Sequence, residues 1–132
     1  GNIAMAKVIS TRNIRPDLKY EPGFELQFGI TDETTGIQSA TLVRTHFPAK
    51  SNSKAHYHSN GDLMWFHMSG PKAAWLIGKE KKEFVTEPGD FIYIPRGEIH
   101  STINSHATEA VEGVGGYGGC GNPYKSGKTF VE

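Results

Sequence analysis

Short stretches of alternating hydrophobic and polar residues run along the chain, separated by glycine, proline and other turn-forming residues. Residues 24–30 read Phe-Glu-Leu-Gln-Phe-Gly-Ile, and this alternation predicts a strand with one buried face. A polar turn at 31–36 connects it to a second predicted strand at 37–47, so a hairpin is expected. Further strands are predicted at 63–68, 72–77, 84–86, 91–94, 99–103 and 108–114. No long window has the hydrophobic spacing of an amphipathic helix.

The two ends of the chain have less regular patterns. Residues 1–20 are expected to form an N-terminal arm or an edge strand. Residues 115–132 form a glycine-rich closing segment, which is expected to be flexible or to be a strand exchanged with a partner subunit. About nine short strands at close spacing predict an all-β fold, a small antiparallel barrel. No internal repeat or long linker divides the chain, so residues 1–132 are predicted to form one domain.

Residues 55–62 have the composition of a metal site, with the sequence Ala-His-Tyr-His-Ser-Asn-Gly-Asp. In an extended strand, residues i and i+2 point to the same face, so His56 and His58 can approach one point. A turn through residues 59–61 can bring Asp62 back toward them. Neutral imidazole nitrogens and a carboxylate oxygen are donors that a divalent transition metal accepts. The stretch therefore predicts a metal site.

A second motif occupies residues 89–104. It has glycine at 89, proline at 95, glycine at 97, histidine at 100 and asparagine at 104. The glycines and the proline permit tight turns at both ends of a short buried strand. This pattern resembles the second conserved motif of the cupin superfamily, and residues 50–70, with their His-x-His pair and Gly70, resemble the first. The two motifs come in the order that the family has.

The resemblance implies both a fold and a metal. The fold is a single cupin, a jelly-roll-like antiparallel β-barrel, and the metal is one divalent transition ion per chain: iron, manganese, nickel, copper or zinc. Carried over by position, the implied ligands are His56, His58, His100 and Asp62. The resemblance also implies a homodimer, formed through edge strands of the N-terminal part.

The fourth ligand has two alternatives. Asp62 stands where the family usually has glutamate, and its separation from Gly70 is one residue longer than the family spacing. Aligning backwards from Gly70 puts Leu63 at the position of the acid, and the site then consists of three histidines. The two alignments turn opposite faces of the next strand inward: Met64, Phe66 and Met68 in the first case, and Leu63, Trp65 and His67 in the second.

Both alignments predict a mainly apolar, aromatic substrate pocket. Met64 and Phe66 are the pocket residues expected if Asp62 points inward. Arg44 and His46 share one face of the predicted strand at 37–47. If that face turns inward, these two side chains can bind a carboxylate or exchange a proton.

Composition narrows the classes of partner and compartment. Fourteen basic residues balance fourteen acidic ones, which gives no electrostatic indication of a nucleic-acid or membrane partner. The longest apolar runs are too short to span a bilayer. Cys120 is the single cysteine, so no internal disulfide is possible and the reducing cytoplasm is the expected compartment.

The expected function follows from the metal site. A mononuclear metal with open positions predicts an enzyme that acts on a small organic molecule. The resemblance to cupins implies that its reaction is of dioxygenase, decarboxylase, isomerase or lyase type. The alternative is a non-catalytic cupin that binds or senses a small molecule or carbohydrate. Fold alone does not choose between these classes.

Overall fold

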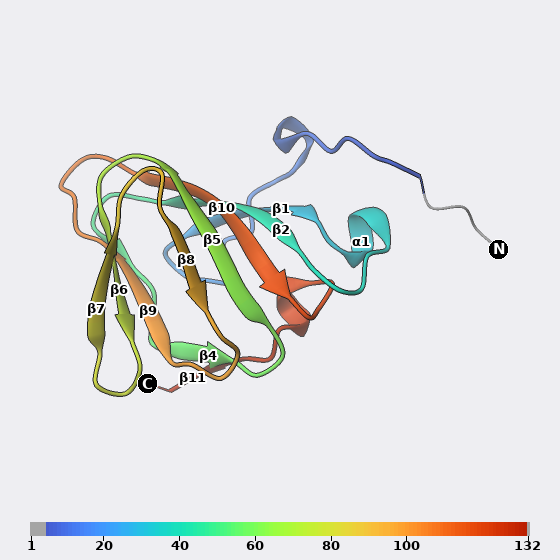
Figure 1. Cartoon of the computed structure of the whole chain (residues 1–132). Helices are drawn as coiled ribbons and strands as arrows, with labels where there is room; N and C mark the ends of the chain where they lie inside the picture. The colour runs from blue at the N-terminus through green and yellow to red at the C-terminus, as the bar shows by residue number, and fades with distance from the viewer. Residues whose placement is uncertain (1–4, 132) are drawn as a thin grey trace.

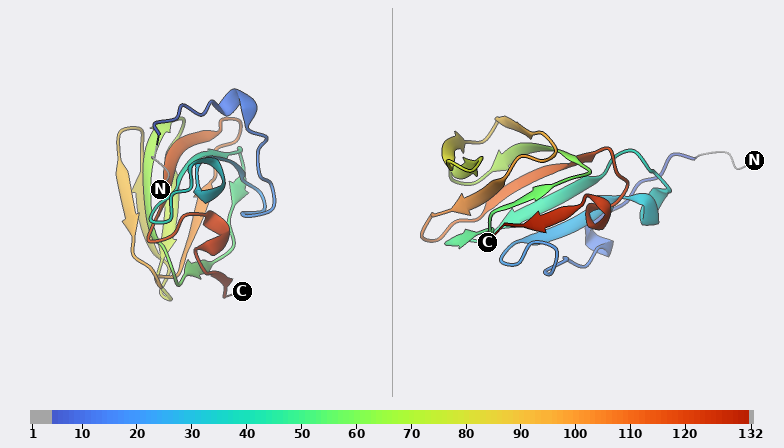
Figure 2. Two further views of the ribbon diagram at one scale, coloured as in Figure 1. Left: turned by 90° about the vertical axis from the view of Figure 1, so that its right-hand side faces the viewer. Right: turned by 90° about the horizontal axis from the view of Figure 1, so that it is seen from below.

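Two antiparallel sheets face each other in the computed structural model, which describes residues 5–131 (Figures 1 and 2). The first has the strand order β1-β2-β10-β5-β8, with strands β1 (Glu25–Ile30), β2 (Leu42–Phe47), β5 (Asp62–Ser69), β8 (Phe91–Ile94) and β10 (Val111–Gly118). The second has the order β11-β4-β9-β6-β7, with β3 beside β9. Its strands are β3 (Ser51–Asn52), β4 (His56–His58), β6 (Ala73–Ile77), β7 (Lys82–Thr86), β9 (His100–Asn104) and β11 (Lys128–Phe130). The prediction of an all-β, jelly-roll-like fold is confirmed.

The predicted hairpin forms, with one change at its turn. Strands β1 and β2 pair antiparallel, but the turn between them contains a short helix, α1 (Asp32–Thr35). The start of this helix is stabilised by the Thr34 hydroxyl, which accepts a hydrogen bond of 2.9 Å from the backbone N–H of Thr31. Residues 37–41, predicted to be part of the second strand, make only an isolated bridge, between Ala40 and Gly118. Two 3₁₀ turns complete the helical elements of the described residues, η1 (Thr11–Asn13) and η2 (Pro123–Lys125).

Strand β10 corrects the expectation that the glycine-rich segment is flexible or exchanged. It lies inside the first sheet, hydrogen-bonded to β2 on one side and to β5 on the other (Figure 1). The indole of Trp65 packs over Gly113, where an added Cβ would lie 2.1 Å from its Cζ2 atom. Glycine is needed here because neighbouring groups fill the space that a side chain would take.

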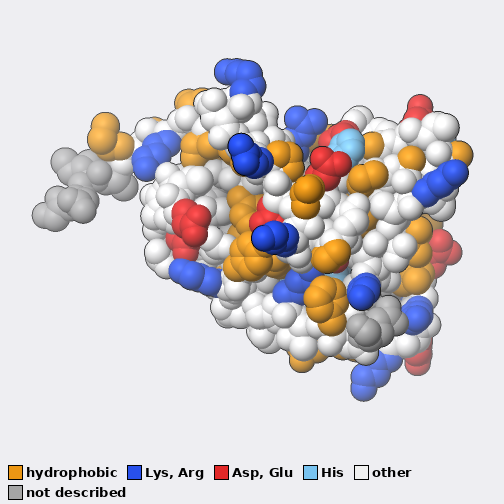
Figure 3. Space-filling view, turned by 180° about the vertical axis from the view of Figure 1, so that it is seen from behind, with side chains coloured by type: hydrophobic (Ala, Val, Ile, Leu, Met, Phe, Trp, Pro, Cys, Tyr) orange, Lys and Arg blue, Asp and Glu red, His pale blue; other side chains and the backbone are white. Residues whose placement is uncertain are grey.

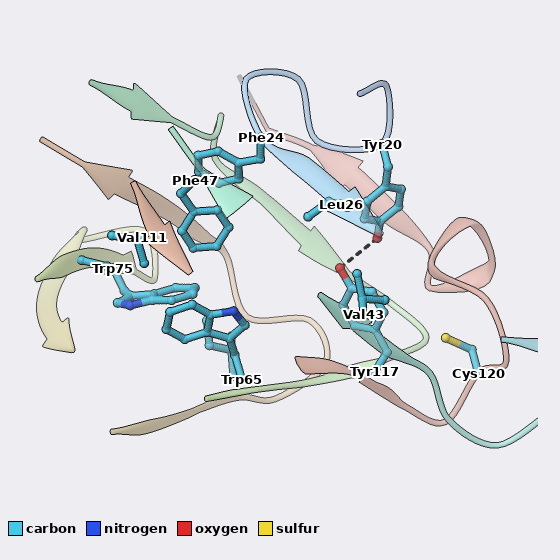
Figure 4. Packing of buried hydrophobic residues seen from close by; sticks show 12 residues of the cluster. Tyr20, Phe24, Leu26, Val43, Phe47, Trp65, Trp75, Val111, Tyr117 and Cys120 are labelled. Carbon is cyan, nitrogen blue, oxygen red and sulfur yellow. Dashed lines mark hydrogen bonds between the residues drawn. The ribbon is translucent and has the colours of Figure 1, made fainter. Parts of the chain in front are cut away.

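The core lies between the sheets and is rich in aromatic residues (Figure 4). At one end the ring of Trp65 stacks on Phe47 with a centroid separation of 5.5 Å, and its centroid lies 5.0 Å from that of Trp75. At the other end Tyr20 and Tyr117 meet through their hydroxyl groups. Burial of this apolar surface is the main force that holds the two sheets together.

Both end segments of the described chain pack close to β4. Strand β11 pairs antiparallel with β4, and the N-terminal arm is joined to β1 by a bridge between Asp17 and Leu26. After this bridge the arm buries Tyr20 and Glu21. Acidic and basic side chains are interspersed on the face shown in Figure 3. None of the described helices is long and apolar enough to span a membrane.

Candidate metal centre

Three buried histidines converge from two neighbouring strands. His56 and His58 lie two residues apart in β4, so both side chains point to the same inner face. His100 begins β9 and pairs directly with His56, which puts its ring on that face as well. One nitrogen from each ring lies within 4.8 Å of the others, and each residue is at most 3 % exposed. This cluster is compatible with a single metal ion.

Backbone carbonyls fix the ring orientation of two of these histidines. The Nδ1 atom of His56 lies 2.6 Å from the carbonyl oxygen of Lys54, and that of His100 lies 3.0 Å from the carbonyl oxygen of Glu98. A carbonyl only accepts hydrogen bonds, so Nδ1 carries the proton in both rings. Each Nε2 atom is then left with a lone pair, which is the form that binds a metal.

Hydroxyl groups fix the third ring, that of His58. Tyr20 donates its hydroxyl hydrogen to the Tyr117 oxygen at 2.9 Å, so the Ser126 hydroxyl, 2.8 Å away, must donate to Tyr20. The Ser126 oxygen is then free to accept from Nδ1 of His58 at 2.9 Å. Nε2 of His58 again keeps its lone pair, and the Tyr117 hydroxyl lies 3.4 Å from it.

Burial keeps the three imidazoles neutral in the metal-free protein. It lowers the pKa of His56 and of His100 to about 4. The pKa of His58 falls still further, because burial is reinforced by repulsion from His100 and His56. Protons therefore do not compete for the metal-binding nitrogens near neutral pH. The donor chemistry of the cluster fits a divalent transition metal.

These lowered pKa values predict that the metal-free protein loses stability in mild acid. Between pH 6.5 and about 4 the unfolded chain protonates these histidines while the folded chain does not. The free energy of unfolding should therefore fall as the pH falls through this window, by about 1.4 kcal/mol per pH unit for each proton taken up. Urea denaturation between pH 7 and pH 5 measures the slope, and His58→Asn should reduce it. A flat profile in the wild type would contradict the prediction.

The structure does not bring Asp62 to the histidines. Its carboxylate points outward and forms an ion pair with Arg96, with Oδ2 3.0 Å from Nη2. The burial of Trp65 and His67 sets this orientation, because they turn the odd-numbered face of β5 inward. The alignment with Leu63 facing inward is the one that the fold adopts.

Of the four residues proposed for the pocket, Arg44, His46 and Phe66 do not line the cavity and Met64 borders it. Arg44 and His46 lie on the outer face of β2, where both contact the carboxylate of Glu112. Phe66 packs on Phe91 of β8 at the outer face, with a centroid separation of 4.7 Å. Met64 borders the cavity, but its side chain is on the outer face of β5 and is 47 % exposed. Alternation along each strand decides these orientations.

A cavity of about 80 Å³ adjoins His56 and His100. Most of its wall is apolar, formed by Phe24, Leu26, Phe28, Val43, Phe47, Leu63, Trp65 and Trp75. A few polar groups interrupt this wall, from Tyr20, Glu21, Thr45, Ser53, Thr102 and Tyr117. A liquid water occupies about 30 Å³, so the cavity suits a molecule of only a few non-hydrogen atoms.

Two charged residues beside the cluster were not found from the sequence. Glu21 precedes a Pro-Gly turn, and Lys128 lies in the closing segment, so both read as ordinary surface charges. In the structure Lys128 pairs directly with His58 across β11 and β4 and forms an ion pair of 2.8 Å with Glu21. The alternation of Lys128-Thr129-Phe130 is the one local signal that this lysine could point inward.

The fold and the histidine cluster define a class, the β-barrel proteins with a buried site suited to one metal ion. Residues 43–112 match the family model described as "Cupin domain", and the chain belongs to this family. No curated protein matches the chain.

Solved structures share this fold at low sequence identity. The polyketide cyclase RemF from Streptomyces resistomycificus superposes with a TM-score of 0.73 at 18 % identity, over 86 % of this chain and 80 % of the other. A predicted oxalate decarboxylase from Thermotoga maritima gives 0.71 at 19 % identity, over 86 % and 99 %. A Streptomyces protein solved with uridine gives 0.73 at 15 % identity, over 97 % and 92 %. At these identities the likeness concerns the fold.

Proposed function

We propose that this protein is a metal-dependent enzyme that acts on a small organic molecule. One observation carries the proposal: three buried, neutral histidines bring one nitrogen each within 4.8 Å of the others, and two of them, His56 and His100, line an apolar cavity. The cluster supplies three histidine donors, and a divalent ion of this kind expands to five ligands, so a position stays open for a substrate even beside a further protein donor. The small cavity volume of about 80 Å³ supports a substrate of few atoms.

The residues around the cluster support chemistry at an oxygen-bearing group. A divalent ion held by His56, His58 and His100 would act as a Lewis acid toward such a group or toward O₂. The Tyr117 hydroxyl, which accepts a hydrogen bond from Tyr20, keeps its own hydrogen available beside His58. The mainly apolar wall lowers the local dielectric constant, which strengthens electrostatic interactions inside the cavity. Decarboxylase, dioxygenase, isomerase and lyase activities are the reaction types proposed.

We further propose a homodimer in a reducing compartment. Pairs of apolar side chains on the outer face of β5 and β8 support an interface between copies: Met64 with Tyr93, and Phe66 with Phe91. Phe91 is 81 % exposed and Tyr93 is 63 % exposed, which is unusual for aromatic residues without a partner. Cys120 is buried and free, which suits a cytoplasmic location.

Two measurements test these proposals. Elemental analysis gives the metal content per chain, and sedimentation velocity gives the number of chains in the particle. One divalent transition metal per chain is expected, in a particle of two chains. Turnover is then tested with small carboxylic acids and enolisable ketones, with and without O₂. A protein that neither retains nor takes up metal would overturn the proposed function, and a particle of one chain at all concentrations would overturn the dimer. Bound metal without turnover of any candidate would favour the non-catalytic binding cupin.

A further inference from the structure

A buried carboxylate lies next to the histidine cluster, although neither cupin-like motif contains it. Glu21 belongs to the N-terminal arm, and its side chain is only 9 % exposed. Its Oε2 atom lies 2.8 Å from the ammonium nitrogen of Lys128, whose side chain is equally buried. Lys128 also donates to the carbonyl oxygen of Tyr20, and its ammonium group lies over the Tyr20 ring. These contacts hold one carboxylate oxygen in place.

The other carboxylate oxygen has no partner. Oε1 of Glu21 is buried and accepts no hydrogen bond from any of the described residues, 5–131. Leaving a buried polar atom unsatisfied costs about 1–3 kcal/mol, and more for a charged group. Native proteins keep few such atoms, and those they keep point to a missing partner such as an ion or a ligand. Glu21 also borders the cavity that His56 and His100 line.

The separation between Glu21 and His56 matches that of two donors on one ion. Oε2 of Glu21 lies 3.5 Å from Nε2 of His56, the atom that the Lys54 carbonyl leaves free for a metal. Donor bonds of about 2.0–2.2 Å in a tetrahedral site place neighbouring donor atoms about 3.3–3.6 Å apart. This contact is therefore as close as coordination of a shared ion requires.

Charge gives a second reason for a carboxylate at this place. The three imidazoles are neutral, and Lys128 places a positive charge close enough to all three to lower their pKa values further. A divalent cation would add to this positive charge in a buried site, where electrostatic repulsion is poorly screened. Glu21 is the negative group that offsets it, because the carboxylate of Asp62 is turned away toward Arg96.

We propose that Glu21 is the fourth protein ligand of the metal, in place of the acid that the first motif lacks. The proposal rests on the metal site of the proposed function. Lys128 is a positioning residue, which holds the carboxylate through Oε2 at 3.5 Å from Nε2 of His56, so that Oε2 and the unpaired Oε1 both face the ion site. The N-terminal arm thus completes a site whose other donors come from β4 and β9.

Metal affinity of two carboxylate variants tests the proposal without a substrate. Glu21→Gln removes the proposed ligand, and Asp62→Asn removes the carboxylate that points outward to Arg96. Zn²⁺ affinity is measured by competition with a chromophoric chelator, and the coordination number by the visible absorption of the Co²⁺-loaded protein. Loss of an outer-shell partner already costs about 10–100-fold in affinity. Glu21→Gln is therefore expected to lose at least about tenfold and to change the Co²⁺ spectrum, whereas Asp62→Asn should match the wild type.

A double variant separates ligand loss from loss of folding. Glu21→Gln alone leaves Lys128 buried without its partner, which destabilises the fold. Glu21→Gln with Lys128→Met removes both charges, so it should fold and still show weakened Zn²⁺ binding and an altered Co²⁺ spectrum. Wild-type affinity and spectrum in the double variant would overturn the role of Glu21, as would a loss of affinity in Asp62→Asn. Failure of the wild type to bind any metal would instead overturn the proposed function.

Discussion

Replacing His58 by alanine is expected to abolish stoichiometric metal binding. His58 supplies one of only three histidine donors, and its ring is 2 % exposed, so no solvent-facing group can take its place. Loss of an outer-shell partner alone typically costs about 10–100-fold in affinity, so loss of a direct ligand should cost more than about a hundredfold. Elemental analysis and competition with a chelator for Zn²⁺ measure the effect. His100→Ala should have the same result.

His46→Ala is the matched control, because it removes a histidine on the outer face of β2. His46 contacts Glu112 and Glu25, and it is not part of the buried cluster. This variant should bind Zn²⁺ as the wild type does. Circular dichroism establishes that each variant remains folded. Tight, stoichiometric Zn²⁺ in a folded His58→Ala protein would contradict the three-histidine site.

Substitution of Gly115 by alanine should lower the free energy of unfolding more than most substitutions of surface residues would. An added Cβ would lie 2.2 Å from the carbonyl oxygen of Met64 and 2.8 Å from the Cα atom of Trp65. Both contacts are with the backbone of β5, so relief requires the two strands to separate. Forcing extra atoms into a packed core costs about 1–3 kcal/mol or more, and about 3 kcal/mol is expected here. Thermal and urea denaturation measure the loss.

Gly118→Ala provides the control in the same strand. Its added Cβ would meet only the flexible end of the Met64 side chain, at 3.4 Å. A change of less than about 1 kcal/mol is therefore expected. Equal stability of the Gly115 and Gly118 variants would show that β10 does not pack between β2 and β5 as described. Such a result would favour the flexible closing segment that composition alone predicts.

Strands were predicted correctly where hydrophobic and polar residues alternate regularly. The prediction was wrong where glycines interrupt the alternation. The pairing of β1 with β2 was predicted correctly because Phe24–Ile30 alternates without interruption. The glycines of β10 carry no side chain that could alternate, so this strand looked like a flexible segment. Its place in the sheet depends on the bulk of Trp65, a residue 50 positions from Gly115.

The sequence also could not identify the carboxylate that lies beside the histidines. Asp62 stood at the expected position in sequence, but the register of β5 turns it outward because Trp65 and His67 occupy the core face. A shift of one residue moves every side chain of a strand to the opposite face of the sheet. Because the spacing differs from the motif by one residue, the sequence could not decide whether Asp62 or Leu63 faces the histidines. Glu21 and Lys128 are 107 residues apart and meet only because both end segments pack beside β4.

The sequence by itself determined the all-β class, the His-x-His pair and, through its resemblance to the cupin motifs, the third histidine. These features depend on short-range geometry: alternation puts His56 and His58 on one face, and glycines with positive φ angles at 89 and 97 form the turns before His100. Only the tertiary structure decided which carboxylate lies beside the histidines and which face of each strand looks inward. Those choices depend on contacts between distant segments, whose packing no local pattern encodes.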